Sequence, residues 1–206
     1  QFVREGVVVF RAGEVLATAV LPGGEKTADT ERVLTGIIYK TNQELLARLN
    51  VANKDLELLW ISKAEFDQAV AALTATPQSF VVRIVSTGNI IYGEPVIGGI
   101  ELYPNHLIYS QGEAMLSEVM DAGHDQQQAE ETVLLFLQKL NATAVKDGVL
   151  PDPIGGWVGD MSGAQLYDAV NKVKRYGGKV QITAAAKQDI YAAGPLNIEI
   201  RVQEAR

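Results

Sequence analysis

The residues best suited to catalysis or metal binding in this sequence are two glutamates in the same local setting. Glu14 lies in the stretch VFRAGEVLAT, and Glu113 lies in the stretch IYSQGEAMLS, 99 residues later. Two carboxylates brought together can act as general acid and base, or can hold metal ions. Asn42 and Asn141 have the same spacing and would stand behind them. One hypothesis is therefore a symmetric site formed by these four residues.

A simpler hypothesis is that each glutamate only belongs to a turn. Gly13 and Gly112 directly precede the two glutamates, and apolar residues lie on both sides. Glycine tolerates the positive φ that many hairpin turns require, so a glycine followed by a polar residue is typical of a hairpin corner. The sequence favours this hypothesis, and a chemical role for Glu14 and Glu113 is the alternative.

The other polar clusters indicate structure rather than chemistry. His106 and His124 lie in no nucleophile–base motif. The segment HDQQQAEE (124–131) holds possible metal ligands, but carboxylates are also expected at the start of a helix. The segment PIGGWVGD (153–160) lacks the lysine and hydroxyl residue of a phosphate loop. The chain has no cysteine, which excludes disulfides and thiolate chemistry. We therefore predict no catalytic residue, no metal ion and no cofactor.

The two glutamates belong to a longer internal similarity, which predicts a duplication. Apolar residues fall on apolar residues when the stretch 6–50 is shifted by 99 positions. With one residue of slip, FDQAVAAL (66–73) matches LYDAVNKV (166–173). We expect two repeats, 1–104 and 105–206. Because no polar linker separates them, we expect one compact unit in which the repeats pack about a pseudo-twofold axis.

The hydrophobic periodicity of each repeat predicts an α/β (α+β) fold with ββαβαββ-like order. The apolar residues of the second repeat's first helix spread more widely than one stripe, so we expect that helix to be more deeply buried. The links 87–95 and 187–195 join the last two strands of each repeat, and both contain Ile and Tyr and end in Gly-Glu-Pro or Gly-Pro. The elements are expected at about 6–10, 14–20, 28–49, 55–62, 63–75, 79–86 and 95–102, and again at about 106–110, 113–120, 126–145, 155–161, 162–176, 179–186 and 196–202.

Composition and charge narrow the classes of function. The chain of 206 residues is 47% hydrophobic and 21% charged, as in globular proteins. Its formal net charge of −7 opposes binding to nucleic acid. No stretch is long and apolar enough to span a bilayer. The chain begins with Gln1 rather than Met, so we expect a piece of a longer protein whose missing part could hold a membrane anchor.

Several stretches together resemble a known bacterial family. They are VVVFRAGEVLATAV, VVRIVSTGNIIYGEPV, NHLIYSQGEAML, GVLPDPIGGWVGDM and DIYAAGPLNIEI. In these the chain is similar to the C-terminal domain of the largely cyanobacterial family called domain of unknown function 3084. The resemblance implies a parent protein with an N-terminal hydrophobic hairpin, a long coiled coil and then this domain. It carries over no catalytic residues. It implies the periplasmic side of the inner membrane, with the cytoplasmic side as the alternative.

These observations predict an interaction or scaffolding head rather than an enzyme. We expect a protein partner or self-association, no nucleic acid, and contact with a membrane only through the missing N-terminal segment. The alternative is a hydrolase or a small-ligand-binding domain that uses Glu14 and Glu113 near the pseudo-twofold axis.

Overall fold

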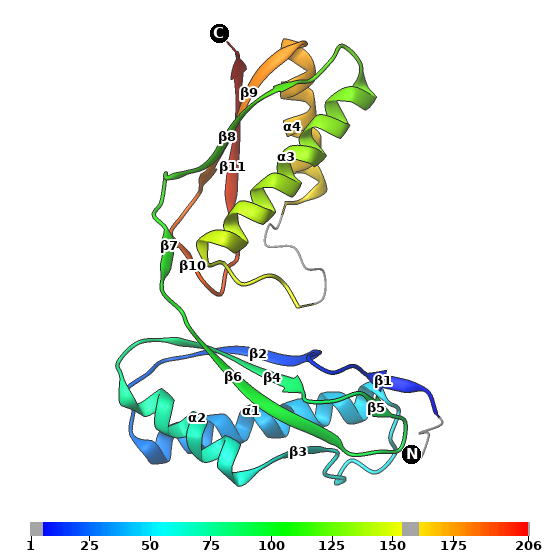
Figure 1. Ribbon diagram of the computed structural model, residues 1–206, viewed down its shortest axis with the longest axis vertical. Coiled ribbons are helices and arrows are strands. Elements are labelled where there is room, and N and C mark those ends of the chain that lie inside the picture. Colours follow the sequence, from blue (N-terminus) through cyan, green and yellow to red (C-terminus); the bar gives the residue numbers. More distant parts are fainter. Residues whose placement is uncertain (1–5, 154–160, 206) are drawn as a thin grey trace. The chain divides into compact units, whose positions relative to one another are not determined.

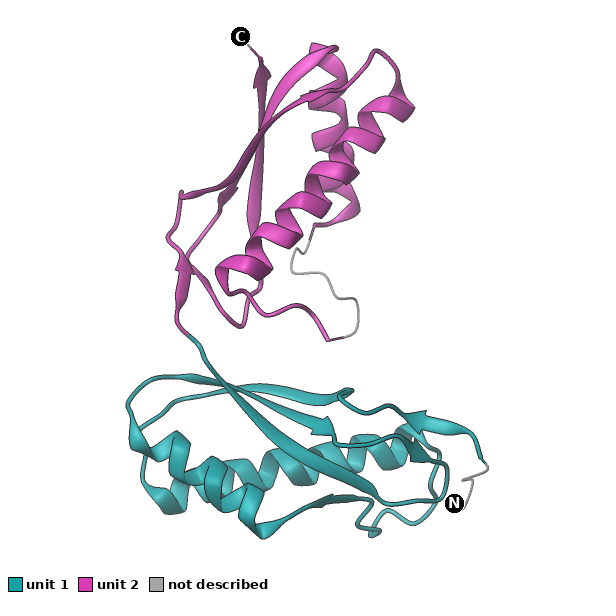
Figure 2. Ribbon diagram, viewed as in Figure 1, with its two compact units in different colours: residues 1–105 teal, residues 106–206 magenta. Residues whose placement is uncertain are grey.

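The computed structural model describes residues 6–153 and 161–205 of the chain. The chain divides into two compact units, Gln1–Asn105 and His106–Arg206, coloured teal and magenta in Figure 2. Each unit has its own helices, its own sheets and its own hydrophobic core.

The first unit places two helices on one face of a four-stranded sheet (Figure 1). Its elements are β1 (Val8–Phe10), β2 (Val15–Leu21), α1 (Thr27–Arg48), β3 (Leu59–Ile61), α2 (Lys63–Ala75), β4 (Phe80–Ser86), β5 (Ile90–Ile91) and β6 (Val96–Pro104). The sheet has the order β2-β4-β6-β3, and its pairs are antiparallel except that β3 runs parallel to β6. A separate antiparallel pair joins β1 to β5.

The second unit combines a three-stranded antiparallel sheet with two helices (Figure 1). Its elements are β7 (Leu107–Tyr109), β8 (Ala114–Asp121), α3 (Gln126–Asp147), α4 (Gly163–Tyr176), β9 (Lys179–Ala186), β10 (Ile190–Tyr191) and β11 (Ile198–Glu204). The sheet has the order β11-β9-β8, and β7 pairs with β10. Ser162 and Gln165 form a capping box that fixes where α4 begins.

Both cores form where alternate residues of a central strand meet the helices. In the first unit, Leu34 of α1 and Leu73 of α2 pack with Val82 of β4. Two residues further along β4, Ile84 packs with Leu46 of α1 and with Phe10. Residues two apart on a strand share one face, so Val82 and Ile84 both point at the helices.

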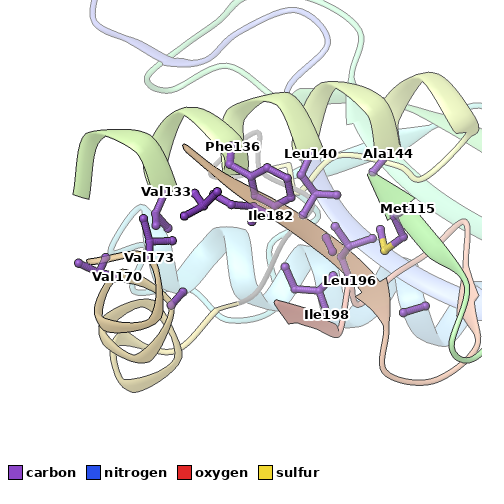
Figure 3. Close-up of a cluster of buried hydrophobic side chains, with 14 of the residues drawn as sticks. Met115, Val133, Phe136, Leu140, Ala144, Val170, Val173, Ile182, Leu196 and Ile198 are labelled. Atoms are coloured by element: carbon purple, nitrogen blue, oxygen red, sulfur yellow. The ribbon is translucent and has the colours of Figure 1, made fainter. Parts of the chain in front are cut away.

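The core of the second unit lies between α3, α4 and β9 (Figure 3). Phe136 and Leu140 project from α3 toward Ile182 of β9, and Val170 and Val173 of α4 face the same core. Each of these side chains is at most 3% exposed. The spacing of Phe136 and Leu140 puts both on one helix face.

The predicted α/β class is confirmed, and the elements of both units follow one another in nearly the same order and spacing. The links 87–95 and 187–195 contain two further short strands, β5 and β10, which the sequence analysis does not predict. The strand expected at 155–161 lies, except for Met161, outside the described residues. A duplication and a packing of the repeats about a pseudo-twofold axis both stay predictions.

The prediction that the second repeat's first helix is more deeply buried is wrong. Six residues are buried in α1 and six in α3. The extra apolar positions of α3 point outward, since Leu134 is 50% exposed and Leu135 is 47% exposed. The additional apolar residues of α3 therefore lie on the protein surface and not in the core. No helix among residues 6–153 and 161–205 is long and apolar enough to cross a membrane.

We expect Phe136→Ala to lower the free energy of unfolding by about 3–5 kcal/mol, because it leaves a cavity in the centre of the second core. Leu135→Ala, on the exposed side of the same helix, is the matched control and should change it by about 0.5 kcal/mol or less. Urea unfolding followed by circular dichroism measures both variants. Equal losses for the two variants would contradict the packing described for α3.

Candidate functional site

The two glutamates predicted from the sequence lie at hairpin corners with the same backbone geometry. Gly13 has φ 82° and Gly112 has φ 83°, in the left-handed region that favours glycine. Apart from the glycine itself and its two chain neighbours, no heavy atom of the described residues lies within 4 Å of where a Cβ would stand on either residue. The requirement for glycine at both corners is therefore conformational and not a matter of space.

Each glutamate closes its own turn with its backbone and its side chain. Glu14 N–H donates to the carbonyl of Arg11 at 3.0 Å, and its Oε2 accepts from Arg11 N–H at 2.9 Å. Glu113 repeats both bonds with Ser110, at 3.0 and 2.8 Å. The carboxylate thus serves a backbone donor that the turn leaves without a strand partner. This use favours the structural hypothesis for both glutamates.

A second polar side chain supports each corner from a distant part of the chain. Ala12 N–H donates to Asn89 Oδ1 at 2.9 Å, and Gln111 N–H donates to Asp189 Oδ1 at 2.7 Å. Asn89 and Asp189 precede β5 and β10, the strands that pair with β1 and β7. Their spacing of 100 residues is the sequence signal that could have identified them.

A symmetric site would require the two corners to meet, and this stays a prediction. Within residues 6–153 and 161–205, no three His, Asp or Glu side chains form a group that could hold a metal ion. The segment 124–131 has a structural role, because Asp125 caps α3 by accepting from Gln128 N–H at 2.8 Å. The backbone N–H of His124 donates to Gln128 Oε1, and the carbonyl of His106 accepts from Ala192 N–H between strands.

Asn42 joins α1 to the start of β3. Its Oδ1 accepts from Leu58 N–H at 2.8 Å and from Leu59 N–H at 2.9 Å, and its Nδ2 donates to the carbonyl of Leu56. These bonds give Asn42 a structural role, and its part in a symmetric site stays a prediction. Asn141 occupies the corresponding place in α3 and is half-buried.

At the end of the long helix, the two units place side chains of opposite charge against the aromatic residue of the first strand. In the first unit, the Arg48 guanidinium lies 5.0 Å from the centre of the Phe10 ring and 3.3 Å from Glu14 Oε1. In the second unit, the matching positions are Tyr109 and Asp147, and the Tyr109 hydroxyl donates to Asp147 Oδ2 at 2.5 Å. Both arrangements fasten the end of the long helix to the buried aromatic ring of the first strand.

The first unit has an open groove between α1, β3 and the beginning of α2, with a volume of about 570 Å³. From α1 the lining residues recur at intervals of three and four, which places them on one helix face. Several apolar and aromatic residues line it while Tyr39 stays 66% exposed and Trp60 stays 54% exposed. The groove is lined by Thr35, Ile38, Tyr39, Asn42, Glu57, Leu59, Trp60, Ile61, Lys63 and Phe66.

The sequence pattern gives little warning of this groove. Trp60 lies in a short apolar run where strand alternation is hard to see, and Tyr39 stands beside the apolar stripe of its helix. A smaller groove of about 220 Å³ lies between α3 and α4 in the second unit. Leu134, Leu166 and Tyr167 line it. The outward-facing Leu134 is thus part of a surface depression.

We expect Glu113→Ala to lower the free energy of unfolding by about 1 kcal/mol, because Ser110 N–H loses its side-chain acceptor. Glu113→Gln keeps an acceptor oxygen and should recover at least half of that loss. Thermal and urea unfolding of the two variants test this. An alanine variant as stable as the unmodified chain would remove the structural role assigned to Glu113.

We also expect stability to fall at high pH through Tyr109. Burial, with the hydrogen bond to Asp147, raises the pKa of Tyr109 well above its ordinary value of 10.0. The folded state therefore holds this proton more tightly than the unfolded state. Its contribution is complete below about pH 10 and is lost as the pH rises toward the folded pKa. Urea unfolding between pH 8 and about 11 should show this loss.

Tyr109→Phe is the control for the pH dependence and should show a shallower alkaline decline. Some decline should remain, because a hydrogen bond to Glu101 raises the pKa of Tyr103 as well. The same alkaline slope in Tyr109→Phe and the unmodified chain would contradict the assignment.

Comparison with known proteins finds one family that resembles most of the second unit. Residues 109–205 match the family described as DUF3084-associated C-terminal helical hairpin. The described part of this range contains the helices α3 and α4. Over 207 aligned residues, the chain is 25% identical to an uncharacterized protein of Nostoc sp.. The alignment covers 96% of this chain but only 39% of that relative. No solved structure matches the chain significantly.

The family match and the relative confirm the resemblance that the sequence motifs indicate. The matched range begins at the last residue of β7 and runs through β11. Residues 109–205, slightly less than half of the chain, are thus similar to the DUF3084-associated C-terminal helical hairpin.

Proposed function

We propose that this chain is a non-enzymatic interaction head that binds a protein partner. The observation that carries the proposal is the open groove of the first unit. It exposes aromatic and apolar side chains at the place where α1, β3 and α2 converge. Contiguous exposed apolar surface is typical of interaction sites in globular proteins.

The geometry of the corners supports the same proposal. The carboxylates of Glu14 and Glu113 each accept a hydrogen bond from a backbone N–H of their own turn. A general acid or base must instead present its carboxylate to a substrate. A hydrolase or ligand-binding site at these residues therefore needs a meeting of the two corners and a release of both turn bonds.

The head would belong to a longer, membrane-anchored protein with a coiled coil. This part of the proposal rests on the family resemblance and on the length of the Nostoc relative, of which the chain spans 39%. The side of the membrane would be the periplasmic one, with the cytoplasmic side as the alternative.

Site-specific photocrosslinking of the full-length protein in its own cells tests the interaction. Benzoylphenylalanine replaces Tyr39 at the groove or Tyr92 as a control in the same unit. The two tyrosines are 66% and 63% exposed, so both probes meet solvent equally. We expect a discrete adduct with one identified protein from position 39 and none from position 92. No adduct at position 39, or the same adducts at both positions, would contradict the proposed function.

A further inference from the structure

We propose that the groove of the first unit takes an extended, basic and apolar peptide segment, which adds as a strand to the free edge of β3. The inference rests on the proposed function and specifies the chemistry of the partner. The outer edge of β3, the apolar surfaces beside it and the charge of its rim each support it.

Among the strands of residues 6–153 and 161–205, β3 has a neighbour on one side only. It ends the sheet order β2-β4-β6-β3 and pairs with β6 in the register Trp60↔Ile97. Val96 N–H donates to the carbonyl of Leu58, so the backbone groups of Trp60 also face β6. Alternation along the strand turns the backbone groups of Leu59 and Ile61 away from the sheet. These groups form an edge to which an extended chain can hydrogen-bond.

Asn42 limits where such a strand can begin. Its Oδ1 already accepts from Leu59 N–H at 2.9 Å. The groups that face outward beyond this bond are the carbonyl of Leu59 and both backbone groups of Ile61. An added strand would therefore bond along the half of β3 that leads toward α2.

Apolar surface lies on both sides of this edge. On the helix side, Ile38 and Tyr39 of α1 and Phe66 of α2 line the groove. On the other face of the sheet, Trp60 and its partner Ile97 are 54% and 43% exposed. Successive side chains of an added strand point to opposite faces, so apolar residues on either face of it would find a surface to cover.

The charge of the rim favours a basic segment. Lys63 Nζ lies 2.8 Å from Asp67 Oδ2, and the negative charge of Glu31 also acts on Lys63. Glu57 lines the same groove, so this region carries three carboxylates and one ammonium group. A segment that carries Lys or Arg beside its apolar residues complements this rim.

A second copy of the chain fits the groove poorly. In another copy, the side chains of Leu59 and Ile61 already pack in that copy's own core. They cannot leave it to fill a neighbour's groove. Pairing two β3 edges would also bring two acidic rims together, which like charges oppose. An extended, basic segment fits better, because its side chains are not already packed in a core and its charge is opposite to that of the rim.

The test selects peptides on the full-length protein from a random phage library, and then synthesises the consensus peptide. We expect apolar residues at alternate positions with Lys or Arg between or beside them. N-methylation of alternate residues should weaken binding about tenfold or more in one register, because it removes hydrogen bonds to the edge. In the other register binding should stay within about twofold, because those N–H groups point away from β3.

Two substitutions on adjacent residues of α1 locate the site. Thr35→Trp fills the groove and should abolish peptide binding. Gly36→Trp is the matched control and should preserve binding, since Gly36 does not line the groove and has open space around it. Glu57→Lys should weaken binding several-fold by reversing a rim charge.

Other results would overturn the inference. They are an acidic consensus, apolar residues at helical spacing, equal effects of both N-methylation registers, or self-association that Thr35→Trp abolishes. A lack of enriched peptides would also overturn it. An adduct from position 39 alongside any of these results would leave the proposed function standing, whereas its absence would remove the proposed function itself.

Discussion

The hairpin corner is the constraint on which the sheet of each unit depends. At this point the chain leaves a short outer strand pair and enters the main sheet. Gly13 N–H donates to the carbonyl of Ser86, and Ser86 N–H donates to the carbonyl of Glu14. Together these bonds pair the start of β2 with the end of β4, and an irregularity between Val15 and Ala17 then shifts the register by one residue. A slip of one residue turns every following side chain to the opposite face, so the corner and this shift together decide which residues of β2 reach the core.

The exchange of Arg48 for Asp147 shows what the long helix needs at its end. An arginine over a phenylalanine ring and an aspartate on a tyrosine hydroxyl carry opposite charges. In both arrangements a polar group contacts the buried aromatic residue of the first strand. The position therefore requires an attachment to the ring, and the sign of the charge follows from the chemistry of that ring.

Periodic and local features could be predicted from the sequence. The helices α1 to α4, the longer strands and the glycines of both corners follow from hydrophobic spacing and turn chemistry. β5 and β10 could not be found in this way, because two residues show no alternation. The attachment of Asn42 to β3 escaped prediction because it joins residues 16 and 17 positions apart. The outward position of Leu134 and Leu135 depends on which face of α3 meets the sheet, and a wide apolar spread leaves this open.

The attachment of Asn42 has a consequence for the solubility of the protein. A free strand edge is a template for unlimited pairing between chains, and native proteins shorten or block such edges. Here the edge has three residues, and a buried asparagine from α1 occupies its first outward donor. The edge of the first unit is thus open but too short and too blocked to support aggregation by repeated strand pairing. Asn42 therefore has two effects: it orders the start of β3, and it opposes aggregation at this edge.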